Sequence, residues 1–452
     1  LRLGDYGWPG GGFLDDVGGG NNSARFLLIN GGLTRILPNG TIAPDLATWT
    51  ISKNHLVYTF TIRPNARFSN GRYVTAQDAA FSLARVLTSS IGPGALLYVG
   101  LIEGAATFNA GKTKTLSGVK VLNSHVLQIT ITKPAAYFLG TLAENSIVFD
   151  TIVVAGKPIG SPNDNFKTNY LTTTCTGNQG AGPFMFVCHD RSSTLHSFYS
   201  GHTPKYTLVP NPYYYGHKPH IRLELPKSAD TYKAYLGDKI DDTSGIPPPY
   251  VNRWRGKSKE YHEFPSPTVL YWAVNVHLAP FDNLHCRLAF AYALDRETVS
   301  NKILDAVEHP LYTLVPRGML GYYAGNDNPH YNPGRARAEL AQCPGRTAPV
   351  ELKYYEGASR NAIEVTVRNL ADAGFNIKLK LISSNDWFSI VSSGYGGMSK
   401  SQTQLVLDNW AQDYPDPQDY CTNLLHTGQQ YAIGGWHNAT YDRLVDRADV
   451  LL

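Results

Sequence analysis

The sequence lacks several features that would identify other classes of protein. Only five of its 452 residues are cysteines, and neither a C-x2-C pair nor an H-E-x-x-H segment occurs, so the common zinc motifs are excluded. No apolar run approaches the roughly 18–20 residues that span a bilayer. Lys and Arg number 40 against 36 Asp and Glu, a net charge of +4 with no basic stripe. The sequence therefore predicts no metal site, no membrane-spanning segment and no nucleic-acid partner.

Aromatic and loop-forming residues are plentiful. The chain contains 28 Tyr, 17 Phe and 7 Trp, together with 42 Gly and 28 Pro. The aromatic residues could build either binding surfaces or a large core rich in strands, and composition alone favours neither. At roughly 150 residues per domain, the length predicts about three domains. Because the sequence begins at Leu1 rather than Met, we expect that a leader was removed or the chain was trimmed.

Hydrophobic periodicity indicates an α/β protein. The segment 350–355 reads as a strand, 360–373 as a helix closed by Gly374, and 376–381 as a second strand. Such a β-α-β unit predicts a mainly parallel sheet. A capping box at 75–78 precedes an amphipathic helix, and the turn around Gly40 is typical of a hairpin.

The cysteines allow two disulfides. Cys175 and Cys188 flank a Gly-rich segment, and we expect them to form a disulfide, which would place the protein in an oxidising compartment. A second pair could join Cys343 to Cys421, leaving Cys286 as a buried free thiol.

The acidic turn 413–419, DYPDPQD, is the main candidate for chemistry. Its carboxylates could act as the pair of a glycoside hydrolase. Asp residues in a Pro-rich turn also form turns and cap helices, and Asp413 beside Trp410 suits ligand binding. His217 and His220 flank a proline, which favours a solvated loop over a metal site.

Segments in order along the chain resemble one family of binding proteins. The most specific is 58–78, YTFTIRPNARFSNGRYVTAQD, which is similar almost position for position to a signature of that family. The family is the extracytoplasmic solute-binding proteins of ABC importers, family 5, which includes dipeptide- and oligopeptide-binding proteins. The other matching segments are 30–47, 182–184, 211–214, 275–296 and 410–417, the last reading WAQDYPDP.

The resemblance implies an α/β fold of the two-lobed, type II periplasmic-binding-protein kind, with an extra subdomain inserted in the first lobe. Carried over to this chain, lobe one is 1–47 together with 161–266, the insert is 48–160, and lobe two is 267–452. Family members continue past the position of Leu452 and return to the first lobe, and we expect that return to be missing here.

The resemblance also implies the site residues. The ligand is expected between the lobes, with Asp413 pairing with the α-ammonium of a peptide. Trp410, Tyr271 and Trp272 are expected to line the cleft, although strand alternation places the last two on opposite faces. In lobe one, Asn30 and Gly32 are expected near the ligand backbone, because glycine permits close approach. With Asn30 and Gly32 from lobe one, the set of predicted ligand-binding residues is complete.

The function that follows is that of a binding protein and not an enzyme. We expect a monomer outside the cytoplasm, periplasmic or lipid-anchored, which delivers a peptide-like solute to an ABC permease and needs no cofactor or metal. An oligosaccharide-binding member of the same family is the first alternative. A glycoside hydrolase that uses the carboxylates of Asp413 and Asp419 is the second.

Overall fold

The computed structural model describes residues 1–4, 28–87, 96–145, 180–187, 205–226, 230–243, 246–264, 266–325 and 328–451. The chain divides into two compact units, Leu1–Ile246 with Val450–Leu452, and Pro247–Asp449. The predicted start of lobe two, residue 267, lies inside the second unit. Cys175 and Cys188, the predicted disulfide pair, lie outside the described residues.

The first unit contains a four-stranded antiparallel sheet within the segment predicted as an insert. Its strand order is β3 (Ala47–Ile51), β4 (Val57–Ile62), β6 (Val126–Thr130) and β5 (Val119–Asn123). The sheet packs against α2 (Ala76–Val86), which begins at the predicted capping box. Thr75 N donates to Asp78 Oδ2 at 2.8 Å, and Asp78 N donates to Thr75 Oγ1 at 3.3 Å, so the capping box is confirmed.

Two smaller sheets and several short helices lie elsewhere in the described part of the first unit. The predicted hairpin joins β1 (Thr34–Ile36) to β2 (Ile42–Pro44), and Gly40 in its turn has a φ of 81° that favours glycine. The second sheet has the order β7 (Phe184–Phe186), β8 (Lys205–Pro210) and β9 (Leu223–Pro226). The helices are α3 (Leu96–Val99), α4 (Ala105–Asn109), α5 (Phe138–Asn145) and α9 (Thr231–Leu236).

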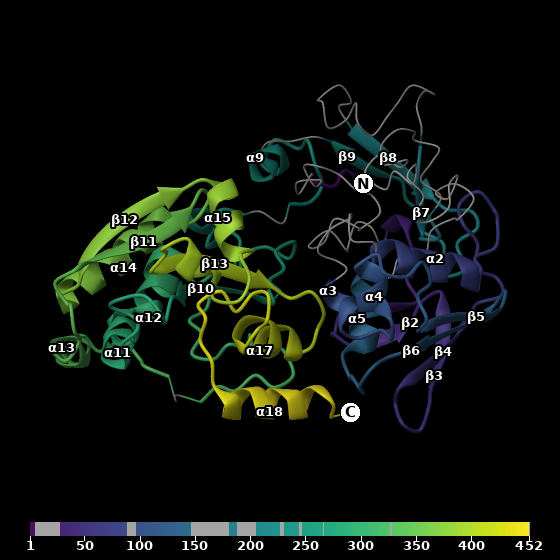
Figure 1. The fold of residues 1–452 in the computed structure, drawn as a ribbon. Coiled ribbons are helices and arrows are strands. Elements are labelled where there is room, and N and C mark those ends of the chain that lie inside the picture. Colours follow the sequence, from purple (N-terminus) through teal and green to yellow (C-terminus); the bar gives the residue numbers. More distant parts are fainter. Residues whose placement is uncertain are drawn as a thin grey trace. The chain divides into compact units, whose positions relative to one another are not determined.

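The second unit is built on one mixed sheet, seen edge-on at the left of Figure 1. Its order is β10 (Thr268–Val274), β13 (Leu405–Ala411), β11 (Pro349–Tyr355) and β12 (Asn376–Ile382). Strand β11 pairs parallel with β12 and β13, and α14 (Arg360–Ala373) connects β11 to β12, so the predicted β-α-β unit is confirmed. The edge strand β10 runs antiparallel to β13, so the sheet is mixed rather than wholly parallel.

Helices cover both faces of this sheet. On one face, α11 (Leu284–Ala293), α13 (Pro333–Ala341) and α14 build the largest core of the unit. On the other face lie α15 (Ser384–Val391), α16 (Gly397–Lys400) and α17 (Gln418–Leu425). The remaining helical segments are α10 (Pro248–Val251), α12 (Arg296–Thr298), the π-helix Val299–Ile303 and α18 (Ala439–Asp449). In the described part of the chain, no helix has the length and apolar character to cross a membrane.

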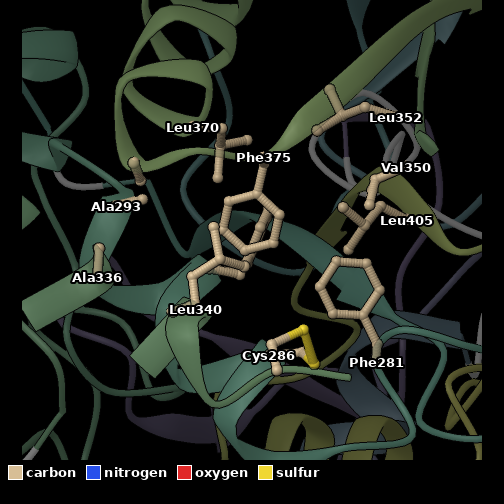
Figure 2. Close-up of a cluster of buried hydrophobic side chains, with 14 of the residues drawn as sticks. Phe281, Cys286, Ala293, Ala336, Leu340, Val350, Leu352, Leu370, Phe375 and Leu405 are labelled. Carbon is tan, nitrogen blue, oxygen red and sulfur yellow. A yellow bond between two sulfur atoms is a disulfide. The ribbon is translucent and has the colours of Figure 1, made fainter. Parts of the chain in front are cut away.

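A disulfide lies in the main core of the second unit and corrects the predicted pairing. Cys286 on α11 is bonded to Cys343, just after α13, with Cα atoms 4.9 Å apart (Figure 2). The prediction of a Cys343–Cys421 pair is therefore wrong, as is that of a free Cys286, and Cys421 on α17 is a free thiol. The physical reason is the packing of α11 directly against α13, which sequence spacing does not reveal.

Candidate functional site

The turn between β13 and α17 is held together by one buried carboxylate. Asp419, in the first turn of α17, is 0% exposed. Its Oδ2 accepts hydrogen bonds from Trp410 Nε1 at 3.0 Å and from the backbone N of Asp413 at 2.9 Å. Its Oδ1 accepts one from Asn423 Nδ2 at 2.9 Å. These bonds fix both the indole of Trp410 and the backbone from which the Asp413 side chain projects.

Asp413 has a different environment from Asp419. Its side chain is partly buried, and no group in the described ranges donates a hydrogen bond to its carboxylate. Burial raises the pKa of Asp413. Burial, and then the charge of Asp413, raises the pKa of Asp419. A partly buried carboxylate that receives no hydrogen bond is stabilised when a cation binds to it.

Aromatic rings pack beside this turn. Trp410 and Tyr431 lie with ring centroids 4.6 Å apart, and both pack on a cluster formed by Val269, Tyr420 and Leu424. Burial, followed by the charges of Asp413 and Asp419, raises the pKa of Tyr431, so its hydroxyl stays neutral. The carboxylates are therefore bordered by apolar and uncharged surface, where an ion pair is weakly screened.

Tyr271 and Trp272 lie on opposite faces of β10, as strand alternation predicts. Tyr271 packs in the same cluster as Trp410, whereas Trp272 packs against the core formed by α11, α13 and α14. The hydroxyl of Tyr271 donates to Oδ2 of the buried Asp408, directly opposite on β13, at 2.8 Å. Of these two predicted cleft residues, only Tyr271 therefore shares the face of Trp410.

Removing the Tyr271 hydroxyl tests this buried pair. Burial raises the pKa of Asp408 to about 6, and the hydroxyl opposes that rise. We expect Tyr271→Phe to cost about 1–3 kcal/mol of unfolding free energy at pH 7.5, where Asp408 is ionised and loses its donor. The loss of stability should be smaller at pH 5. The pKa of Asp408 is higher in the folded than in the unfolded protein, so Asp408 takes up a proton as the pH falls through its folded-state pKa, and this uptake stabilises the folded state.

Urea unfolding at both pH values measures this difference. Tyr354→Phe, which removes a buried tyrosine hydroxyl from the helical core instead, is the control. An equal loss at both pH values for Tyr271→Phe would mean that only packing was lost.

Asn30 and Gly32 belong to the first unit, whereas the other predicted residues belong to the second. Asn30 is buried. Gly32 N donates to Asp45 Oδ2 at 2.8 Å, and its carbonyl accepts from Leu46 N at 2.9 Å. Both backbone groups of Gly32 therefore form hydrogen bonds within the first unit. A close approach that requires glycine occurs instead at Gly182, where a Cβ would lie 2.5 Å from the carbonyl carbon of Ile29.

Sequence reasoning missed the roles of Asp408 and Tyr431, and it considered Asp419 as a catalytic candidate or as a turn and cap residue, without its hydrogen bond to Trp410. Asp408 is found only through the register of β10 with β13, and Tyr431 comes from a loop beyond α17. Asp419 could have been noticed as an acidic residue in the first turn of a helix after a Pro-rich turn. In the described ranges, no three His, Cys, Asp or Glu side chains are grouped to hold a metal ion.

The geometry argues against hydrolysis by the two carboxylates. All three donors to Asp419 come from the chain, and its side chain has no exposed surface, so it has no access to a substrate. A hydrolase needs both carboxyl groups at the scissile bond. The turn therefore does not offer the two accessible carboxyl groups that acid–base hydrolysis needs.

Comparisons with known proteins identify the family of this chain. Residues 41–432 match the model of the bacterial extracellular solute-binding proteins, family 5. The chain is 26% identical to the dipeptide-binding protein DppE of Bacillus subtilis over 92% of this chain and 75% of that protein. It is 24% identical to the periplasmic murein peptide-binding protein MppA of Escherichia coli over 92% of this chain and 76% of that protein.

Solved structures share the fold. The complex of Haemophilus influenzae OppA with RPPGFSPFR aligns with a TM-score of 0.75 at 19% identity, covering 100% of this chain and 87% of that one. The resemblance found in the sequence is thereby confirmed, and with it the two-lobed α/β fold. The family comprises binding proteins rather than enzymes, which decides against the hydrolase. The chain belongs to the bacterial extracellular solute-binding proteins of family 5.

Proposed function

We propose that the solute is a peptide, that Asp413 binds its α-ammonium, and that the protein delivers the peptide to an ABC permease. We further propose that a single copy of the chain captures the peptide outside the cytoplasmic membrane. The names of the relatives, a dipeptide-binding and a murein peptide-binding protein, support a peptide ligand. The observation that carries the proposal is the partly buried carboxylate of Asp413, which receives no hydrogen bond within the described part of the chain.

The chemistry of an ammonium ion fits this carboxylate. An R-NH3⁺ group has three donors and a full charge, and a charge-assisted hydrogen bond to a carboxylate is roughly twice as strong as a neutral one. The partly buried surroundings weaken screening by solvent. A ligand without the amine would leave the carboxylate desolvated and unpaired, so the site discriminates against it. This discrimination does not depend on the peptide's side chains, which suits a carrier of varied peptides.

A thermal-shift series tests the proposal. Trialanine and pentaalanine carry a free α-ammonium, their N-acetylated forms lack it, and maltotriose represents the oligosaccharide alternative. A ligand at 100 times its Kd adds about 2.7 kcal/mol to the unfolding free energy. We expect stabilisation by a free peptide and much less by its acetylated form. Stabilisation by maltotriose alone, or by none of the peptides, would overturn the peptide assignment.

A further inference from the structure

Asp419 is a buried ionisable group that the proposed function does not use. It sits under the Asp413 turn, with no exposed surface, yet it is a carboxyl where a neutral side chain could make the same hydrogen bonds. An asparagine would accept from Trp410 and from the amide of Asp413 with its carbonyl oxygen. Rotation of the Asn423 amide would then preserve the third bond. Turn geometry alone therefore does not require a carboxylic acid at this position.

The second carboxyl changes the electrostatics of the site. Asp419 Oδ2 lies 2.9 Å from the backbone N of Asp413, so the two carboxyl groups are near neighbours beside the cluster that includes Trp410. Burial, and then the charge of Asp413, raises the pKa of Asp419. An empty pair therefore keeps one proton over a range of pH in which an isolated aspartate is ionised. An ammonium at Asp413 supplies the positive charge that allows both carboxyls to ionise.

We propose that Asp419 is a positioning residue whose proton links peptide capture to pH: the empty Asp413–Asp419 pair holds one proton, and a bound α-ammonium displaces it to solvent. This inference rests on the proposed function and deepens it, because it makes affinity depend on proton concentration. The proton leaves as the ammonium binds, so each bound peptide releases one proton and no bond other than O–H is broken.

The direction of the pH dependence follows from this exchange. The complex holds fewer protons than the empty site, so affinity is greatest above the pKa of the empty pair and falls as the pH drops through it. A one-proton release gives a tenfold change in affinity per pH unit. The α-ammonium of a peptide itself titrates at about 7.7–8.0, so the ligand is almost fully charged up to about pH 6.5 and mostly charged at pH 7.5.

Other titratable groups lie around the Asp413–Asp419 pair. Tyr420 and Tyr431 face it, and burial raises the pKa of each, so both stay neutral. From the same turn and from β13, Asp416 and Asp408 have pKa values raised by burial and could add their own pH dependence. The carboxylates of α18 contact α17 or the loop after it; these contacts are Asp442 with Thr427, Asp446 with His426, and Asp449 with Thr422. From the segment 311–319, Leu311, Leu314 and Met319 pack against the cluster that includes Trp410 and Tyr431.

The variant Asp419→Asn separates these contributions, because it retains every other titratable group. Titration calorimetry uses the alanine peptide that gives the larger thermal shift, in phosphate and in Tris at pH 6.5. The two buffers have different ionisation enthalpies, so the difference in heat reports released protons. We expect the wild type to release about one proton and to lose about tenfold in affinity per pH unit below the pKa of the empty pair. Asp419→Asn should release only the small fraction of a proton that burial keeps on Asp413 at this pH, and its affinity should stay nearly flat from pH 6.5 to 7.5.

The outcomes distinguish this inference from the proposed function. If the wild type binds the peptide without proton release, or if Asp419→Asn releases as many protons as the wild type, the proton link is wrong while peptide binding stands. If Asp419→Asn loses affinity equally at every pH, Asp419 serves only the structure of the turn and the inference fails. If neither protein binds any free peptide, the proposed function fails first. Thermal unfolding of Asp419→Asn without ligand checks that the variant folds.

Discussion

Asp413→Asn is expected to weaken binding of a free-amine peptide by about 30- to 5,000-fold, the equivalent of roughly 2–5 kcal/mol for losing one partner of a buried charge pair. The side chain keeps its size and loses only its charge. The loss arises because the ligand ammonium would be desolvated opposite a neutral amide. Titration calorimetry at pH 7.5 with trialanine or pentaalanine measures it.

A neighbouring carboxylate provides the matched control. Asp416 lies in the same turn, and its carboxylate accepts from Gln418 N at 2.9 Å, so its role is to cap α17. Asp416→Asn should leave peptide affinity within a few-fold of the wild type. Acetylated peptide should bind wild type and Asp413→Asn about equally weakly. Similar losses for Asp413→Asn and Asp416→Asn would show that net negative charge, and not a specific ion pair, attracts the ligand.

Removal of the Cys286–Cys343 disulfide has the largest expected effect on stability. The two cysteines are 57 residues apart in sequence. Closing a loop of that length restricts the unfolded chain by about 4 kcal/mol on the chain-entropy model. Both side chains are also buried in the core of α11, α13 and α14. We therefore expect the double variant Cys286→Ala, Cys343→Ala to lose about that much unfolding free energy, measured by urea unfolding.

Cys421→Ala is the control for this experiment, because it removes a cysteine that forms no disulfide. It should change stability by much less, in keeping with a partly buried thiol. Peptide binding by the double variant should persist below its unfolding midpoint, since the disulfide lies on the opposite face of the sheet from Trp410. A double variant as stable as the wild type would mean that the cross-link does not form in solution.

Local patterns predicted much of the architecture. The capping box before α2, the hairpin at Gly40 and the β11-α14-β12 unit all follow from interactions between residues near in sequence. Such features depend on backbone conformation and on hydrophobic periodicity, which can be read from a single chain. The family was likewise predicted from ordered motifs, whereas the binding role of Asp413 stays a prediction.

Contacts between distant segments could not be predicted in this way. The disulfide partner of Cys286, 57 residues away in sequence, depends on two helices that pack together, whereas the sequence suggested a free Cys286 and a Cys343–Cys421 pair. The bond from Tyr271 to Asp408 depends on strand register across 137 residues. In both cases the pairing is a property of how elements pack and not of how they are spaced.

The sequence by itself determined which elements form and which family they build, because helix caps, turns and alternating strands are local or patterned along the chain. Only the tertiary structure decided that Asp419 is buried beneath Asp413 and holds Trp410 in place. It also decided that Trp272 faces the helical core while Tyr271 faces the turn. The physical reason is that burial and electrostatic environment arise from packing, which leaves Asp413 partly exposed and buries Asp419, six residues further along the chain, completely.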